Sequence, residues 1–305
     1  MKPWKSWTGV VLVVVALGGC GQDGHPPLPG PEVPLAPASP WPKFRGNARQ
    51  TGHGFARPKC NVGPAWDVRT GKGIFSTPVV GADGTVYVGS ADRVFYALHP
   101  DGSERWRFQT GEIIDSSALL DDLGRIYFGS GDGHLYALDA ATGEPVWTFE
   151  ADPPSVNDAF INWFEGNVAI GPDGTLYVPN DNFFVYAIDR ENGEVVWKAT
   201  TPDQTWSLPA VNPENGNLFF GNNNLLEILG ANTYSLDASG KQRWIASSNG
   251  TIAASPLLTS EGKVILGGYD GFVRAYGARR GNLLWEFGAR WSAPLSWRDN
   301  PVTSR

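Results

Sequence analysis

IDSSALLDDLGRIYFGSGDGHLYALDAATGEPVWTF, residues 114–149, is the stretch of the sequence that decides the fold. It contains four short runs of apolar or alternating residues, and glycine-containing turns such as Asp132-Gly133 separate these runs. Short runs bounded by such turns predict antiparallel strands that are joined as hairpins. The stretch therefore predicts a four-stranded antiparallel sheet.

The same unit of sequence occurs four more times, at residues 75–108, 164–199, 206–246 and 252–287. Its fourth predicted strand always carries a tryptophan, and one further tryptophan precedes the first unit: Trp66, Trp106, Trp147, Trp197, Trp244 and Trp285. Successive tryptophans are 40, 41, 50, 47 and 41 residues apart. A four-stranded unit of about 40 residues that repeats in this way predicts an all-β fold, the β-propeller.

Aromatic residues also recur on the second and third predicted strands of the first four units. The second strands carry Tyr87, Tyr127, Tyr177, Phe219 and Ile265, and the third carry Tyr96, Tyr136, Tyr186, Tyr234 and Ala275. One sheet cannot bury both of its faces alone, so the sheets must stack as blades around an axis. We interpret the aromatic residues as the contacts between neighbouring blades.

Composition and charge exclude several classes of protein. The 305 residues include 38 glycines and 24 prolines, and only 18% are charged, which disfavours a helical bundle. The net charge is −7, and no basic run follows the first five residues, so we expect no nucleic-acid partner. Two cysteines, Cys20 and Cys60, are too few for a disulfide scaffold, a cysteine-rich zinc site or an iron–sulfur cluster.

The first 40 residues predict an export signal and a tether. A charged start and the apolar run at residues 10–17 have the form of a signal peptide, which we place at residues 1–19. Residues 20–40 are rich in proline, favour an extended conformation and predict a tether. The propeller is then expected to occupy residues 41–305.

The segment Leu17-Gly18-Gly19-Cys20 resembles the bacterial lipobox. The resemblance implies that Cys20 carries a lipid and anchors the protein to a membrane. In the resembling lipoproteins an aspartate after the cysteine favours retention in the inner membrane. This chain has Gly21 there, so we expect an outer-membrane anchor in the cell envelope.

The repeated pattern resembles the pyrroloquinoline-quinone (PQQ) repeat. The similarity covers about residues 66–297 and includes the Asp-Gly turn, the Tyr-containing strands and the final tryptophan of each unit. In that family the repeat builds the propellers of quinoprotein dehydrogenases. It also builds non-enzymatic envelope lipoproteins such as BamB. The resemblance therefore implies the fold but leaves the function open.

The number of blades stays open in the sequence. Five units are complete, Trp66 belongs to a single strand before them, and residues 289–305 contain the strand-like segment Ser292-Ala293-Pro294-Leu295. Either these ends form an irregular sixth blade, or the chain is a shortened relative of a longer propeller.

Catalytic and metal-binding motifs are missing from the sequence. The resemblance implies that many quinoprotein dehydrogenases use a vicinal Cys-Cys pair, an acidic base and a calcium ion held by carboxylate and amide groups. This chain has no Cys-Cys pair, and its four histidines have no metal-ligand spacing. Asp-Gly pairs such as Asp83-Gly84 are explained by hairpin turns. We expect no catalytic residue, no metal and no cofactor, with PQQ and calcium as the alternative.

Two insertions interrupt the repeat and predict binding loops. One adds nine residues between Trp147 and Val168, and the other adds six residues after Gly221. In an up-and-down sheet both loops emerge at the same end of the propeller. Aromatic and aliphatic side chains among amides are typical of recognition loops. The candidate binding residues are Asn157, Asp158, Phe160, Asn162, Trp163, Asn222, Asn223, Asn224, Leu226 and Glu227.

The sequence as a whole predicts a non-enzymatic envelope lipoprotein, whose propeller is a scaffold that binds a protein partner or ligand through loops on one face. The alternatives are a PQQ-dependent dehydrogenase-like protein and a binder of a small ligand, a sugar or a cofactor, in the propeller channel. A second alternative for the loops is that they fold over the channel and contact nothing else.

Overall fold

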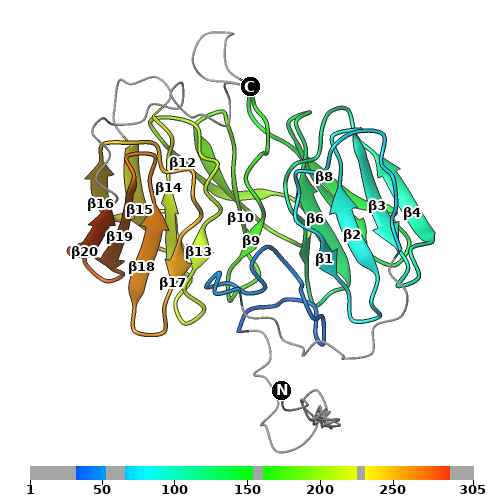
Figure 1. Cartoon of the computed structure of the whole chain (residues 1–305), viewed down its shortest axis with the longest axis horizontal. Helices are drawn as coiled ribbons and strands as arrows, with labels where there is room; N and C mark the ends of the chain where they lie inside the picture. Colours follow the sequence, from blue (N-terminus) through cyan, green and yellow to red (C-terminus); the bar gives the residue numbers. More distant parts are fainter. Residues whose placement is uncertain (1–31, 53–65, 154–160, 225–230, 289–305) are drawn as a thin grey trace, which may run out of the picture.

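The computed structural model describes residues 32–52, 66–153, 161–224 and 231–288. Within these ranges the protein consists of five four-stranded antiparallel sheets, each with its strands in chain order, which confirms the predicted β-propeller architecture (Figure 1). No helix in the described ranges is long and apolar enough to span a membrane.

The strands of the five blades follow one another along the chain. Blade 1 contains β1 (Val79–Val80), β2 (Val86–Gly89), β3 (Val94–Leu98) and β4 (Glu104–Gln109). Blade 2 contains β5 (Leu119–Leu120), β6 (Arg125–Gly129), β7 (His134–Asp139) and β8 (Pro145–Glu150). Blade 3 contains β9 (Ala169–Ile170), β10 (Leu176–Pro179), β11 (Phe184–Ile188) and β12 (Val195–Thr200). Blade 4 contains β13 (Ala210–Val211), β14 (Leu218–Gly221), β15 (Ala231–Leu236) and β16 (Gln242–Ser248). Blade 5 contains β17 (Leu257–Leu258), β18 (Lys263–Gly267), β19 (Phe272–Gly277) and β20 (Leu283–Gly288).

The outer-strand tryptophans of blades 1 to 4 pack against the next blade in the same way. Trp106 Nε1 donates a hydrogen bond to the carbonyl of Ala140 at 3.1 Å, and its ring lies against Gly143. A Cβ atom on Gly143 would lie only 2.7 Å from the ring, so there is no space for a side chain. The φ of this residue is +77°, which also favours glycine. We call this arrangement the tryptophan socket.

The socket recurs at four other positions. At each of them a tryptophan donates to the carbonyl of one residue, and its ring lies against a glycine. The sets are Trp66 with Pro100 and Gly102, Trp147 with Arg190 and Gly193, Trp197 with Ala238 and Gly240, and Trp244 with Ala278 and Gly281. Blades 1 to 5 are therefore joined by a contact that each repeat encodes for itself.

Trp66 occupies the place of an outer strand that precedes blade 1. The chain after it continues the repeat, because Gly71 N donates to Asp92 Oδ2 just as Gly111 N donates to Asp132 Oδ2. Trp285, in contrast, is 41% exposed and has no socket in the described part of the chain. The predicted closing segment at residues 289–305 lies outside the described residues.

One prediction about the repeat is wrong by one residue. In blades 1 to 3 the alanine that pairs with the tryptophan follows the tyrosine of the third strand, as at Ala97 beside Trp106. In blade 5, Ala275 pairs with Trp285, so Arg274 and not Ala275 takes the place of the tyrosine. The two residues are neighbours on β19 and point to opposite faces of the sheet, so the pairing register decides which of them takes this place.

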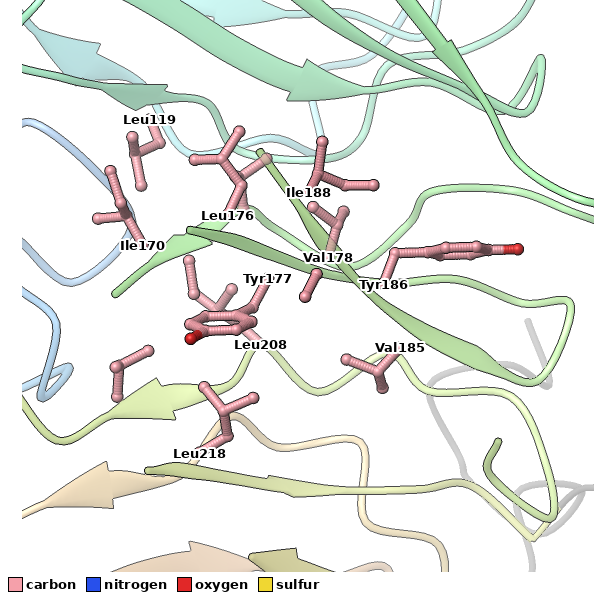
Figure 2. Packing of buried hydrophobic residues seen from close by; sticks show 14 of the residues in the cluster. Leu119, Ile170, Leu176, Tyr177, Val178, Val185, Tyr186, Ile188, Leu208 and Leu218 are labelled. Carbon is pink, nitrogen blue, oxygen red and sulfur yellow. The ribbon is translucent and has the colours of Figure 1, made fainter. Parts of the chain in front are cut away.

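The apolar core runs between the sheets. Around blade 3 it includes Tyr177, Tyr186 and Leu176, which are fully buried (Figure 2). Leu119 of blade 2 and Leu218 of blade 4 belong to the same cluster. The middle blade is thus packed on both faces, as a stacked propeller requires.

Residues 32–52 form a strap across one end of the propeller, drawn in blue in Figure 1. Backbone hydrogen bonds join the strap to the last residue of the first strand in four blades: Val80, Leu120, Val211 and Leu258. Leu35 is 1% exposed and belongs to the main core cluster. Residues 33–40, which the sequence analysis placed in the tether, are therefore part of the folded structure.

Candidate functional site

The end of the propeller opposite the strap carries the departures from the repeat, and we call it the upper mouth. It is formed by the turns between second and third strands and by the connections from one blade to the next. Backbone hydrogen bonds tie these segments together: Gly131 N donates to Ile113 O at 2.9 Å, and Asp181 N donates to Trp163 O at 3.0 Å. Asn223 N donates to Gln204 O at 2.8 Å in the same position of the next blade.

One position of the turn changes its chemistry along the chain. Blades 1 and 2 have the small residues Ala91 and Gly131 there, whereas blades 3 and 4 have Asp181 and Asn223. Asp181 is 1% exposed and Asn223 is fully buried. None of the four side-chain polar atoms of these two residues has a hydrogen-bond partner in the described residues. Buried polar groups without partners are rare in folded proteins, so this pair marks the site.

A second position of the upper mouth varies in the same blades. Ile113, Trp163 and Gln204 accept the backbone hydrogen bonds described above. The residues two positions after them are Asp115, Glu165 and Trp206, respectively, and all three are partly buried. The indole N–H of Trp206 is buried and makes no hydrogen bond of acceptable geometry with the described residues. It nevertheless lies close enough to the Asp181 carboxyl to favour its charged form.

The charges of Glu165 and Asp115 raise the proton affinity of Asp181, and the charge of Asp115 raises that of Glu165. Burial, and then the charge of Glu165, raise the pKa of Asp181 to about 9. Burial, and then the charge of Asp115, raise the pKa of Glu165 to about 7. Burial also raises the pKa of Asp115. None of the three forms a salt bridge with a described lysine or arginine.

The two insertions reach this mouth, but much of each lies outside the described residues. Five of the predicted binding residues fall there: Asn157, Asp158, Phe160, Leu226 and Glu227. Trp163 packs against the turn at Gly131, and a Cβ atom added to this glycine would lie 3.4 Å from the indole ring. The carbonyl of Asn162 accepts a hydrogen bond from the side chain of Asn180 at 2.8 Å. The neighbouring Ile161 is 39% exposed.

The predicted residues of the second insertion have other surroundings. Asn222 is fully buried, and its side-chain oxygen accepts a hydrogen bond from Asn232 N at 2.9 Å. Asn224 is half-buried and donates through its backbone N–H to Thr251 Oγ1 at 3.1 Å. Of the predicted residues that the structure describes, only Asn223 is a buried side chain whose polar atoms have no hydrogen-bond partner there.

The sequence reasoning missed Asp115, Glu165, Asp181 and Trp206. The available signal was the residue type at equivalent positions of the repeat: Asp181 and Asn223 stand where Ala91 and Gly131 stand in earlier blades. The search for insertions passed over these substitutions because they do not change the length of the repeat. The predicted lipidation site, Cys20, lies outside the described residues.

Solved structures confirm the fold. The quinohemoprotein alcohol dehydrogenase of Comamonas testosteroni is similar with a TM-score of 0.67 and 18% identity, over 82% of this chain and 49% of the other. BamB of Moraxella catarrhalis is similar with a TM-score of 0.57 and 17% identity, over 73% of this chain and 67% of the other. A europium-containing methanol dehydrogenase is similar with a TM-score of 0.62 and 16% identity, over 74% and 53%. The similar structures include both enzymes and BamB, and the matched region is about half of the alcohol dehydrogenase.

A family profile adds a match in sequence. No curated protein matches the chain. The profile of the family described as outer membrane protein assembly factor BamB matches residues 61–226 and 185–303, which together span all five blades. The chain therefore belongs to this BamB family of PQQ-repeat β-propellers.

Proposed function

We propose that the protein is a non-enzymatic scaffold of the cell envelope that binds a protein partner through its upper mouth. The observation that carries this proposal is the gathering of buried, unpaired polar groups and the exposed Ile161 at the one end that the strap leaves free. Rigid sheets hold these groups in place, as in other proteins that present binding loops on a β scaffold. The family description suggests the assembly of outer-membrane proteins as the process.

The proposal includes the membrane anchor. A lipid on Cys20, followed by proline-rich chain as far as the strap, would hold the propeller near a membrane. We place that anchor in the outer membrane because Gly21 follows the cysteine. Labelling with a radioactive fatty acid, compared between the full chain and Cys20→Ala, tests the anchor separately from partner binding.

A quinone-dependent dehydrogenase is the alternative that the similar enzymes suggest. Two observations bear on the calcium and quinone site that this resemblance implies. In the described residues no three His, Cys, Asp or Glu side chains are close enough together to hold one metal ion. The chain also has no vicinal cysteine pair. We therefore assign no catalytic step to the upper mouth.

Photo-crosslinking from the upper mouth tests the scaffold proposal. The photo-crosslinking residue p-benzoylphenylalanine replaces Ile161 in the full chain, which is expressed in its native envelope. The matched control carries the same residue in place of Val146, which is 42% exposed on β8, away from the mouth. We expect a discrete protein adduct from position 161 that position 146 does not form. Identical adducts at both positions, or none at 161, would contradict the proposal.

A further inference from the structure

We propose that Asp181, Glu165 and Asp115 form a site for a guanidinium group, supplied by an arginine side chain of the protein partner. This inference rests on the proposed function, because it takes the partner to be a protein. It adds the chemistry by which the upper mouth recognises that partner.

The unpaired state of these groups indicates a ligand. Asp181 is 1% exposed, and neither of its oxygens has a hydrogen-bond partner in the described residues. A buried polar group without a partner destabilises the folded state, and more so if it is charged. Asn223 repeats the situation in the next blade with both an unpaired donor and an unpaired acceptor. A ligand that brings several N–H groups would satisfy both oxygens of Asp181 at once.

The spacing of the carboxyl groups favours an organic cation over a metal ion. The charges of Glu165 and Asp115 both act on Asp181, yet in the described residues no group of three or more His, Cys, Asp or Glu side chains could hold a metal ion. A guanidinium is planar, carries five N–H donors and stacks on aromatic rings. It can therefore reach acceptors that lie further apart, and the indole N–H of Trp206 beside Asp181 can report on its binding.

Binding of a cation must displace a proton from this site. Among the described residues, the groups that shift the pKa of Asp181 are Glu165, Trp206, Asp115 and Asp203, and none of them is basic. At neutral pH the pKa of about 9 keeps Asp181 protonated. A guanidinium favours the charged carboxylate, so its affinity should rise between pH 6 and pH 9.

Nuclear magnetic resonance of the tryptophan indole N–H groups provides the test. Nitrogen-15-labelled full chain is titrated with N-acetyl-arginine methylamide, and the Trp206 signal is assigned with the Trp206→Phe variant. The neutral isostere N-acetyl-citrulline methylamide and Ca²⁺ are titrated in parallel. Asp181→Asn removes the charge at nearly constant shape. Glu191→Gln, in an exposed turn at the end that carries the strap, is the matched control variant.

We expect a saturable shift of the Trp206 signal with the arginine compound, stronger at pH 8.5 than at pH 6.5. Asp181→Asn should weaken binding by at least about tenfold, and Glu191→Gln should leave it unchanged. An equal response to citrulline, no response to arginine, or saturation by Ca²⁺ alone would overturn the inference.

The crosslinking experiment separates this inference from the proposed function. If position 161 captures the same partner in Asp181→Asn as in the wild type, the scaffold proposal stands and the guanidinium site is wrong. If the arginine compound binds but position 161 captures no partner, the cation site stands as a small-molecule site and the scaffold proposal is wrong. Loss of the adduct in Asp181→Asn, with Glu191→Gln unaffected, supports both.

Discussion

Asp181 occupies a turn position at which a smaller side chain is sufficient for the fold. Ala91 and Gly131 make the same backbone hydrogen bond in blades 1 and 2 without a polar side chain. The carboxyl of Asp181 is therefore not needed to build the turn. Its burial near Glu165 instead gives the folded protein a group that binds its proton unusually tightly.

This tight proton binding makes the stability depend on pH. The pKa of Asp181 is about 9 in the folded protein, against about 4 for an unfolded aspartate. The folded state therefore binds more protons, and its stability falls as the pH rises from about 4 to about 9. We expect Asp181→Asn to raise the free energy of unfolding by about 1–3 kcal/mol at pH 8 and by much less at pH 5.

Urea unfolding at both pH values, followed by tryptophan fluorescence, measures this difference. The matched variant Glu191→Gln, on an exposed turn, should show the same pH dependence as the wild type. A stabilisation by Asp181→Asn that is equal at pH 5 and pH 8 would show that the carboxyl is not the titrating group.

The tryptophan socket is the element that turns five sheets into one stack. Each socket joins the outer strand of one blade to the glycine turn of the next, so its two halves are about 35 to 45 residues apart in sequence. The glycine is needed because the indole ring fills the space of a side chain. Neighbouring blades should therefore lose stability together when one socket is blocked.

Two glycines of blade 2 separate the effect of the socket from that of the backbone. Gly143 and Gly124 have nearly the same φ, +77° and +75°, but only Gly143 lies against a tryptophan. Alanine at either position is strained, by about 1 kcal/mol. We expect Gly143→Ala to destabilise the protein by about 1–3 kcal/mol more than Gly124→Ala, because its Cβ displaces Trp106.

Thermal unfolding of both variants, with near-ultraviolet circular dichroism as the signal of tryptophan packing, measures the difference. The Gly143→Ala variant should lose part of that signal before it unfolds. Equal melting temperatures and spectra for the two variants would mean that the socket contributes little to the contact between blades.

The strands and sockets could be predicted from the sequence, whereas the polar group of the upper mouth could not. Tryptophan, tyrosine and glycine recur at fixed spacings because each blade packs against its neighbour through the same contacts. Asp115, Glu165 and Asp181 lie on different connections, and only the stacking of the blades brings them together. Which residue of β19 is equivalent to the tyrosine of the other blades could not be predicted from the sequence either. The pairing register of β19 with β20 assigns Arg274 to this position.

At the scale of the whole molecule, the strap joins blades that are far apart in the chain. Arg45 donates a hydrogen bond to Ser255 O of blade 5 at 2.8 Å, and Gln50 donates to Leu208 O of blade 4 at 2.8 Å. Leu35, at the other end of the strap, packs with blade 2. The strap thus fixes the positions of the first and last described blades relative to each other.

Truncation of a strap side chain should therefore destabilise the whole propeller. Leu35→Ala is expected to lower the free energy of unfolding by about 2–4 kcal/mol, because it removes a buried side chain from the main core. Leu123→Ala, at a leucine that is 47% exposed, is the matched control and should change it by less than about 1 kcal/mol. Urea unfolding measures both, and similar values for the two would contradict a structural role of the strap.

The route of the strap also decides how the molecule responds to mechanical force. A pull on the chain at Glu32 loads blade 2 first, then blade 1, and then blades 5 and 4, because the strap bonds to them in that order. The force is therefore distributed over the first strands of several blades. It does not detach the outer strands one after another. If Cys20 is the anchor that we propose, tension between the membrane and a partner held at the upper mouth would pass along the axis of the propeller.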